Sequence, residues 1–287
     1  MVFTEERALF GLDHLHITDC VFEKGESPLK EAKDISMDRC LFRYKYPLWY
    51  TSNVHVRQAT WFEDARAGVW YVDDIGVEKC LIKAPKNFRR VKNLYMEEVT
   101  FTNAKETLWS CDDVTLKDVR VKGDYFGMNC TSIKADSLVL DGNYSFDGVR
   151  DLNITNSHLI SKDAFWNCEN VVVENSFITG EYLGWNSKNV NLINCVIESL
   201  QGMCYIDNLV MKNCHLINTT LAFEYSHVDA EIDNRIESVL NPVSGEIRAK
   251  EIGTLIIQKD RIDPGLTHIK CDSIENKTDI VDWSMVM

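Results

Sequence analysis

The sequence has no apolar run that approaches the roughly eighteen residues of a membrane-spanning helix. It also lacks an excess of basic residues, because 31 lysines and arginines stand against 44 acidic residues and leave a net charge of −13. A chain this acidic does not suit a nucleic-acid backbone. Near the N-terminus, Glu5 and Glu6 occupy positions where a signal peptide has apolar residues. We therefore expect a cytoplasmic protein that binds neither membranes nor nucleic acid.

What the sequence does contain is an internal repeat. The pattern apolar-x-apolar-x-x-small-x-apolar occurs twelve times, with starts 19 to 21 residues apart and a degraded last copy. Its copies begin at Leu15, Ile35, Val54, Ile75, Leu94, Val114, Ile133, Leu152, Val171, Val190, Leu209 and Val228. Such a period is typical of a solenoid, in which each repeat buries its apolar side chains only against its neighbours.

Each copy holds two short runs in which apolar and polar residues alternate, as in strands with one buried face. A third strand is predicted just before each start, for example over 48–51, 69–72, 108–111, 165–168 and 203–206. Three strands per coil predict an all-β fold, a right-handed parallel β-helix of about 12 coils of 19–21 residues. Leucine-rich repeats fit less well because no helix-like outer segment is found, and a square pentapeptide helix would need twenty residues per coil.

Asparagine recurs at the corners of these predicted coils. The residue four after the start is Asn156, Asn175, Asn194 and Asn213 in consecutive copies. Asn tolerates the left-handed backbone of a tight corner, and stacked amides can hydrogen-bond along a column. We expect one domain, with an N-terminal cap over 1–12, regular coils over 13–226, and irregular C-terminal coils and a cap over 227–287.

The ten cysteines include no pair at the two-residue spacing of zinc or redox motifs. Eight of them occupy two small inward slots of the repeat, namely Cys20, Cys40, Cys80, Cys195 and Cys214 in one and Cys111, Cys130 and Cys168 in the other. Cysteine is among the most frequently buried residue types, so we interpret these residues as core. We expect free thiols in a reducing compartment and neither a metal nor another cofactor.

One column of the third strand mixes tryptophan with charged residues, five positions before each start. Its tryptophans are Trp49, Trp70, Trp109, Trp166 and Trp185. Because an unpaired charge in a tight core would cost several kcal/mol, we expect this column to face outward. The column six before each start is apolar or small throughout and is expected to face inward. The alternative is an interior aromatic ladder flanked by solvated loop charges.

An outward row of indoles and polar groups is suited to carbohydrate, since sugar rings offer apolar faces and hydroxyls. A basic cluster of Arg66, Lys86, Arg89 and Arg90 would hold a carboxylate or phosphate of the ligand. The other predicted substrate-binding residues are Trp70, Trp109, Asp124, Lys162, Trp166 and Trp185. The expected partner is thus a small carbohydrate or an acidic sugar, and self-association into homo-oligomers is left open.

Asp124, Asp147, Asp163 and Glu181 form an acidic cluster on consecutive predicted coils. Carboxylates one coil apart would be separated by about 5 Å, the spacing of a retaining glycosidase pair. The hypothesis is cleavage of a glycosidic bond, with Asp147 and Asp163 as the acid–base pair and Glu181 as the alternative catalytic carboxylate. The competing hypothesis is a non-catalytic module that binds glycan or a protein partner through the same face.

Several sequence blocks resemble a known family. They include Lys45-Tyr46-Pro47-Leu48-Trp49-Tyr50, Arg66-Ala67-Gly68-Val69-Trp70-Tyr71, Ser161-Lys162-Asp163-Ala164-Phe165-Trp166-Asn167 and Gly180-Glu181-Tyr182-Leu183-Gly184-Trp185-Asn186. The chain is similar to a family of mostly bacterial proteins of unknown function with a pectin-lyase-like right-handed β-helix. The resemblance implies this fold and no activity. The Gly-His-Gly and Arg-Ile-Lys elements of polygalacturonases are missing, as is an acidic triplet of the pectate-lyase kind.

Overall fold

The computed structural model describes residues 1–282 of the chain. Regular structure in this range is β, apart from one three-residue 3-10 helix at Pro264–Leu266. The chain divides into two compact units, Met1–Gly142 and Asn143–Met287. Within residues 1–282, no helix is long and apolar enough to cross a membrane.

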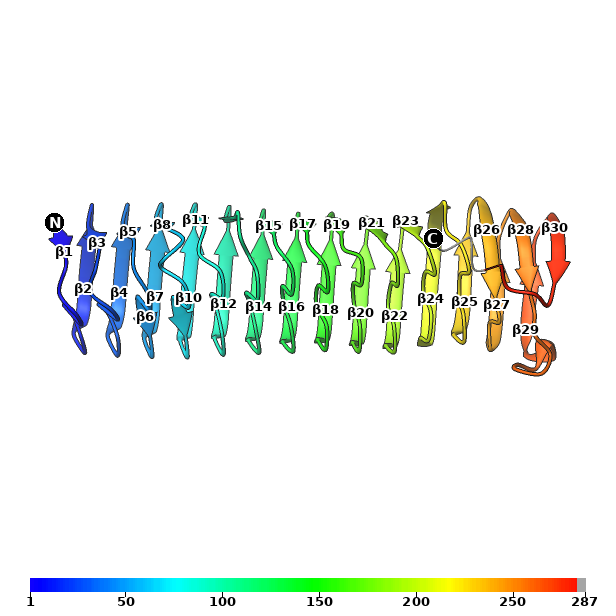
Figure 1. Ribbon diagram of the computed structural model, residues 1–287, viewed down its shortest axis with the longest axis horizontal. Coiled ribbons are helices and arrows are strands. Elements are labelled where there is room, and N and C mark those ends of the chain that lie inside the picture. Colours follow the sequence, from blue (N-terminus) through cyan, green and yellow to red (C-terminus); the bar gives the residue numbers. More distant parts are fainter. Residues whose placement is uncertain (283–287) are drawn as a thin grey trace. The chain divides into compact units, whose positions relative to one another are not determined.

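In the first unit, every repeat contributes one strand to each of two parallel sheets. The six-residue strands are β2 (Asp13–Thr18), β4 (Lys33–Asp38), β7 (Ser52–Arg57), β10 (Asp73–Glu78), β12 (Lys92–Glu97), β14 (Asp112–Lys117) and β16 (Thr131–Asp136). The shorter strands are β1 (Val2–Phe3), β3 (Val21–Phe22), β5 (Leu41–Phe42), β8 (Thr60–Trp61), β11 (Leu81–Ile82), β13 (Thr100–Phe101), β15 (Arg120–Lys122) and β17 (Val139–Asp141). Successive coils of the unit lie side by side (Figure 1).

The second unit follows the same plan. Its longer strands are β18 (Arg150–Thr155), β20 (Glu169–Glu174), β22 (Lys188–Ile193), β24 (Asp207–Ile217), β25 (His227–Ile232), β27 (Ser244–Arg248) and β29 (Thr267–Lys270). The other strands are β19 (His158–Ile160), β21 (Phe177–Gly180), β23 (Val196–Ser199), β26 (Arg235–Leu240), β28 (Glu251–Ile256) and β30 (Ser273–Thr278). The strands β26, β28 and β30 pair into a parallel sheet of their own.

The strand register follows the sequence repeat. Ile75 of β10 pairs with Leu94 of β12, which in turn pairs with Val114 of β14, and all three are starts of the repeat. The expected all-β parallel β-helix is confirmed. The expected count of about 12 coils is too low, because the solenoid has about 15 turns. Beyond Val228 the apolar pattern weakens, yet β27 and β29 continue the same sheet. Residues 283–287 of the predicted cap lie outside the described residues.

The third side of the coil differs from its prediction. Among the repeats that start from Ile35 to Leu209, strands form there only as β6 (Leu48–Trp49) and β9 (Val69–Trp70), with isolated bridges from Trp70 to Arg89 and from Arg89 to Trp109. In the later coils, Ala222 bridges to Val239 of β26. In place of the strands predicted over 165–168 and 203–206, the chain forms turns and irregular segments. Left-handed residues at alternate positions interrupt the predicted strands: Phe165 has φ of 61° and Asn167 has φ of 54°. A run with such alternation cannot keep the extended backbone of a strand.

The inward columns form the core of each unit. Phe88, Phe146 and Phe165 are fully buried at the position six before the repeat start, as predicted. Nine cysteines are free and buried, and Cys271 is the one that is partly exposed. Burial raises the pKa of the Cys80, Cys168 and Cys204 thiols to about 12. The core interpretation of the cysteines is confirmed.

Asparagine ladders fix the corners of the coils. In the second unit, Asn208 Nδ2 donates to Asn189 Oδ1 at 2.9 Å, and Asn189 Nδ2 donates to Asn170 Oδ1 at 3.0 Å. All three residues have positive φ, between 53° and 65°. A second ladder joins Asn213 to Asn194 and Asn194 to Asn175. Asparagine is thus suited to these corners for two reasons: it tolerates the left-handed backbone conformation, and its side-chain amide hydrogen-bonds to the asparagine of the next coil.

We expect Asn189→Ala to lower the free energy of unfolding by about 2 kcal/mol, because it removes two amide hydrogen bonds and places a Cβ-bearing apolar residue in the left-handed region. Urea unfolding followed by circular dichroism measures the change. The matched control is Asn153→Ala, an exposed asparagine on β18 that lies outside the ladders. Equal shifts in the two variants would contradict the role of the ladder.

The native protein is expected to have about one thiol that reacts rapidly with a disulfide reagent, because reactivity requires an accessible thiolate and nine of the ten cysteines are buried. In Cys271→Ser this rapid phase should vanish, while all remaining thiols react after unfolding in guanidinium. Rapid labelling of several cysteines in the folded protein would show that the coils are not packed as described.

Candidate functional site

The outward column of tryptophans lies along the third side of the coil in both units. Trp70 and Trp166 are half-buried, whereas the residues that follow them, Tyr71 and Asn167, are exposed. The indole Nε1 of Trp70 donates to the carbonyl of Lys86 at 2.9 Å, and that of Trp166 to the carbonyl of Tyr182 at 2.8 Å. Each indole therefore fastens the loop of the next coil and leaves part of its ring at the surface. The outward orientation of the five tryptophans is confirmed, whereas Cys204 and Phe223, at the same position of later repeats, are buried.

In the first unit, two pairs of rings form an aromatic platform. Trp49 stacks on Trp70 with centroids 5.3 Å apart and planes 9° from parallel. Beside them, Tyr50 stacks on Tyr71 at 4.8 Å and 2°, and the two tyrosines are 48% and 38% exposed. Large exposed rings in such regular array are unusual on a surface that has no ligand to bind.

Arg89 continues the same column between two indoles. Its guanidinium carbon lies 5.1 Å from the Trp70 ring centre and 4.8 Å from that of Trp109. Glu106 accepts a hydrogen bond from Arg89 at 2.9 Å and lies 3.3 Å from the Lys86 ammonium. Partial burial raises the pKa of Glu106, but the two neighbouring cations lower it further, so that it lies below its ordinary value. Lys86 and Arg89 thus share one carboxylate, which offsets one of their two positive charges.

The rest of the predicted basic cluster is exposed. Arg90 lies over the Tyr71 ring at 5.6 Å, and neither Arg90 nor Arg66 forms an ion pair with a residue among 1–282. Asp124 is exposed and belongs to the first unit, whereas the other three members of the predicted acidic cluster belong to the second.

A longer aromatic ladder runs through the second unit. Trp166 and Trp185 have ring centres 5.9 Å apart, Trp185 and Tyr205 4.4 Å, and Tyr205 and Tyr225 5.3 Å. We call these four residues the aromatic ladder of the second unit. Tyr205 is 37% exposed, and the other three rings are half-buried.

The three predicted catalytic carboxylates all have partners within the second unit. Asp147 accepts a hydrogen bond from Asn167 at 2.8 Å, and Glu181 lies 3.0 Å from the Lys162 ammonium, whose pKa it raises. Asp163 is only 2% exposed. Its burial raises the pKa of this carboxyl, against the opposing charge of Lys162. A ligand on the outer surface therefore reaches Asp163 only if the neighbouring loop moves.

A pocket of about 470 Å³ was not predicted from the sequence. It is lined by Tyr205, Glu224, Tyr225, Gln258, Arg261 and the C-terminal segment 279–281. Counting back from Val228 places Phe223 in the outward column, but Phe223 is fully buried. Glu224 occupies the outward position instead, because Tyr205 N donates to its carbonyl at 2.7 Å, as Asn167 N does to that of Trp185. The sequence count places Glu224 beside this column, four before Val228, and the one-residue shift moves it into the column.

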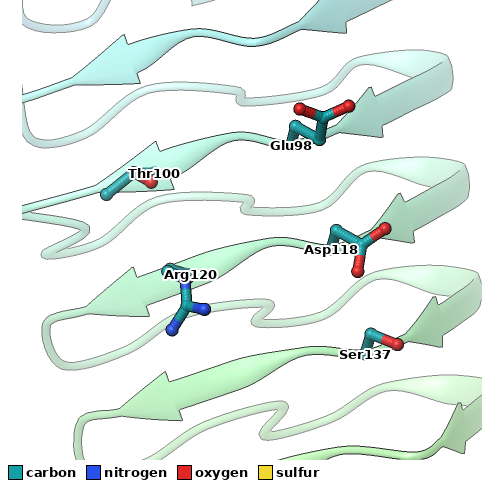
Figure 2. Close-up of a pocket in the computed structure, with 5 residues that line it drawn as sticks. All are labelled: Glu98, Thr100, Asp118, Arg120 and Ser137. Carbon is teal, nitrogen blue, oxygen red and sulfur yellow. The ribbon is translucent and has the colours of Figure 1, made fainter.

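Another surface pocket, of about 420 Å³, belongs to the first unit and to a different side of the coil. Figure 2 shows Glu98, Asp118 and Ser137 one above another at the corners of three coils, with Thr100 and Arg120 beside them. Glu98 is paired with Lys79 at 3.5 Å. The pocket has no aromatic side chain in its lining. Among residues 1–282, no group of three or more His, Cys, Asp or Glu side chains is arranged to hold a metal ion.

Residues 1–270 match the model of a family described as "Protein of unknown function (DUF3737)". The chain belongs to this family. No curated protein matches the sequence. Among solved structures, the chain is similar to PfbA, a surface adhesin of Streptococcus pneumoniae, with a TM-score of 0.42 and 8% identity over 85% of this chain and 83% of that one. A second PfbA structure gives a TM-score of 0.20 and 6% identity over 93% of this chain and 75% of that one. Likenesses this distant carry no argument about function.

For this DUF3737 protein we expect Asp163→Asn to raise the unfolding midpoint at pH 7. A carboxyl whose pKa is raised by folding destabilises the fold once pH exceeds its ordinary value of 3.8, and this cost grows until pH passes the raised value. The gain should therefore shrink below pH 4. Thermal unfolding at pH 3.5 and pH 7 measures both. Asp229→Asn, on an exposed face of β25, controls for the loss of one negative charge. A gain that stays the same at both pH values would contradict the assignment.

Proposed function

We propose that this protein binds neutral carbohydrate through the outward aromatic rings of the third side of its β-helix. The observation that carries the proposal is the aromatic ladder of the second unit, in which four rings follow one another at centroid distances of 4.4 to 5.9 Å. A row of partly exposed rings suits an extended chain of sugar residues, each with an apolar face. The platform of Trp49, Tyr50, Trp70 and Tyr71 in the first unit is a second surface of the same kind.

The charges of this face favour a neutral ligand over an acidic one. Lys86 and Arg89 share Glu106, so two of the four cations expected to hold an acidic sugar already have a carboxylate partner, and Lys162 is likewise paired with Glu181. A polyanion would have to displace these pairs on a chain of net charge −13. The hydroxyl groups of a neutral sugar can bind without displacing these ion pairs, because the exposed carboxylates and amides of this face offer both hydrogen-bond acceptors and donors.

Glycosidic cleavage is the second candidate, and one observation favours it. The raised pKa of Asp163, close to Glu181, is the property expected of a general acid. Its 2% exposure weighs against it, because a general acid must reach the glycosidic oxygen. Binding is therefore the leading proposal. A reducing compartment such as the cytoplasm is proposed with it, supported by ten free cysteines.

Titration calorimetry with xylo-, manno-, cello- and malto-hexaose is expected to detect binding to the full chain. Trp185→Ala should weaken it about tenfold, since it removes the central ring of the ladder. Tyr95→Ala is the matched control, because Tyr95 is an exposed ring on β12 outside the ladder. Binding of oligogalacturonate in preference to all neutral hexaoses would overturn the choice of ligand. Release of new reducing ends from any of these sugars would favour the glycosidase hypothesis instead. That hypothesis is then tested with the variants Asp147→Asn and Asp163→Asn, which should abolish the release.

A further inference from the structure

The aromatic ladder of the second unit ends in a cavity. Tyr205 and Tyr225, its last two rings, line the pocket of about 470 Å³ together with Glu224, Gln258 and Arg261. The volume lies in the range of small-molecule sites. The ladder and the pocket therefore form one surface within this unit, open at the ladder and hollowed at its end.

Glu224 is held in a fixed position on the pocket wall. It is 7% exposed, and Gln201 Nε2 donates to its Oε2. Burial raises the pKa of this carboxyl, while Gln201 and the charge of Arg261 oppose the shift. Burying a carboxyl group costs free energy. A mostly buried carboxyl in a pocket wall, such as that of Glu224 with one oxygen already hydrogen-bonded, is typical of a group that orients a ligand.

Two further polar groups complete the lining. Arg261 is exposed, and its guanidinium is bonded to the Tyr225 hydroxyl, which raises the pKa of Arg261. Gln258 is oriented by Asn241, whose Nδ2 donates to Gln258 Oε1 at 2.8 Å. The carboxylate acceptor of Glu224 comes from one loop, and the Gln258 amide and Arg261 guanidinium come from a second loop, and all three lie beside two aromatic rings.

We infer that this pocket is a terminal subsite that takes one neutral sugar ring, with its face on Tyr205 and Tyr225 and its hydroxyls on Glu224, Arg261 and Gln258. The inference rests on the proposed function and deepens it. Among the pocket-lining residues two carboxylates, Glu224 and Asp279, stand against one guanidinium, which disfavours an anionic sugar. A donor–acceptor mixture around aromatic rings matches the paired hydroxyls and apolar face of a pyranose.

The test uses the full chain with two kinds of probe, the free monosaccharides glucose, mannose, xylose and galactose, and the corresponding neutral hexaoses. Saturation-transfer NMR measures monosaccharide binding, and calorimetry measures the hexaoses. Glu224→Gln keeps the shape of the side chain and should weaken both about tenfold by removing a charge-assisted hydrogen bond. Arg261→Ala should do the same, and because Arg261 is exposed this variant is expected to fold. Trp166→Ala, at the far end of the ladder, should weaken the hexaoses alone.

The outcomes separate the two ideas. Hexaose binding that is lost in Trp166→Ala but unchanged in both Glu224→Gln and Arg261→Ala would overturn the pocket and leave the ladder. Monosaccharide binding that depends on Glu224 and Arg261, with hexaose binding indifferent to Trp166, would support the pocket and overturn the ladder. If no neutral sugar binds the wild-type protein, both are overturned.

Discussion

The structure depends on one constraint: each coil must place its strands in register with those of the next. Pairings such as Ile75 with Leu94 and Val171 with Val190 bring identical repeat positions together. Each inward side chain therefore packs against the side chain at the same repeat position of the next coil. A repeat has no core of its own, and stability arises from these contacts between neighbours. The stacked asparagines at the corners serve the same end, because an amide column is satisfied only when the coils are aligned.

The third side shows what happens where strand pairing is weak. Left-handed residues at alternate positions interrupt the strands, although backbone hydrogen bonds such as those from Tyr50 N to the Trp70 carbonyl and from Asn167 N to the Trp185 carbonyl still join neighbouring coils. Tryptophan side chains add to these bonds. The indole N–H groups of Trp49, Trp70 and Trp166 each reach a carbonyl in the loop of the following coil, while the rings stay partly at the surface. The residues that hold this side together are thus the same ones that give it aromatic character, so the tryptophan column needs no function to explain its presence. The proposed function rests on the whole aromatic ladder of the second unit, in which Tyr205 and Tyr225 continue the row of rings beyond the tryptophans.

The charged side chains of this face, like the tryptophans, form contacts between neighbouring coils. Arg89 lies between two indoles and shares Glu106 with Lys86, and Lys162 is paired with Glu181. Members of the predicted basic and acidic clusters are thus paired with residues outside both clusters, Lys86 and Arg89 with Glu106 and Glu181 with Lys162. Asp163 and Glu224 are the exceptions, since both are buried carboxyls with raised pKa values. Of the two, Glu224 lines the pocket of about 470 Å³, which is why the ligand assignment follows Glu224.

The sequence by itself determined the solenoid, its strand register through the starts at Leu15 to Val228, the buried cysteines and the outward tryptophans. These follow from short-period alternation that repeats every 19 to 21 residues, a local signal that survives without any knowledge of the partner coil. Only the tertiary structure decided the missing third strands, the extra coils beyond Val228, the pairing of the charges and the pocket at Glu224. Those depend on backbone φ values, on a one-residue shift and on loops as distant in sequence as Tyr205 and Arg261, which come together only when the coils are stacked.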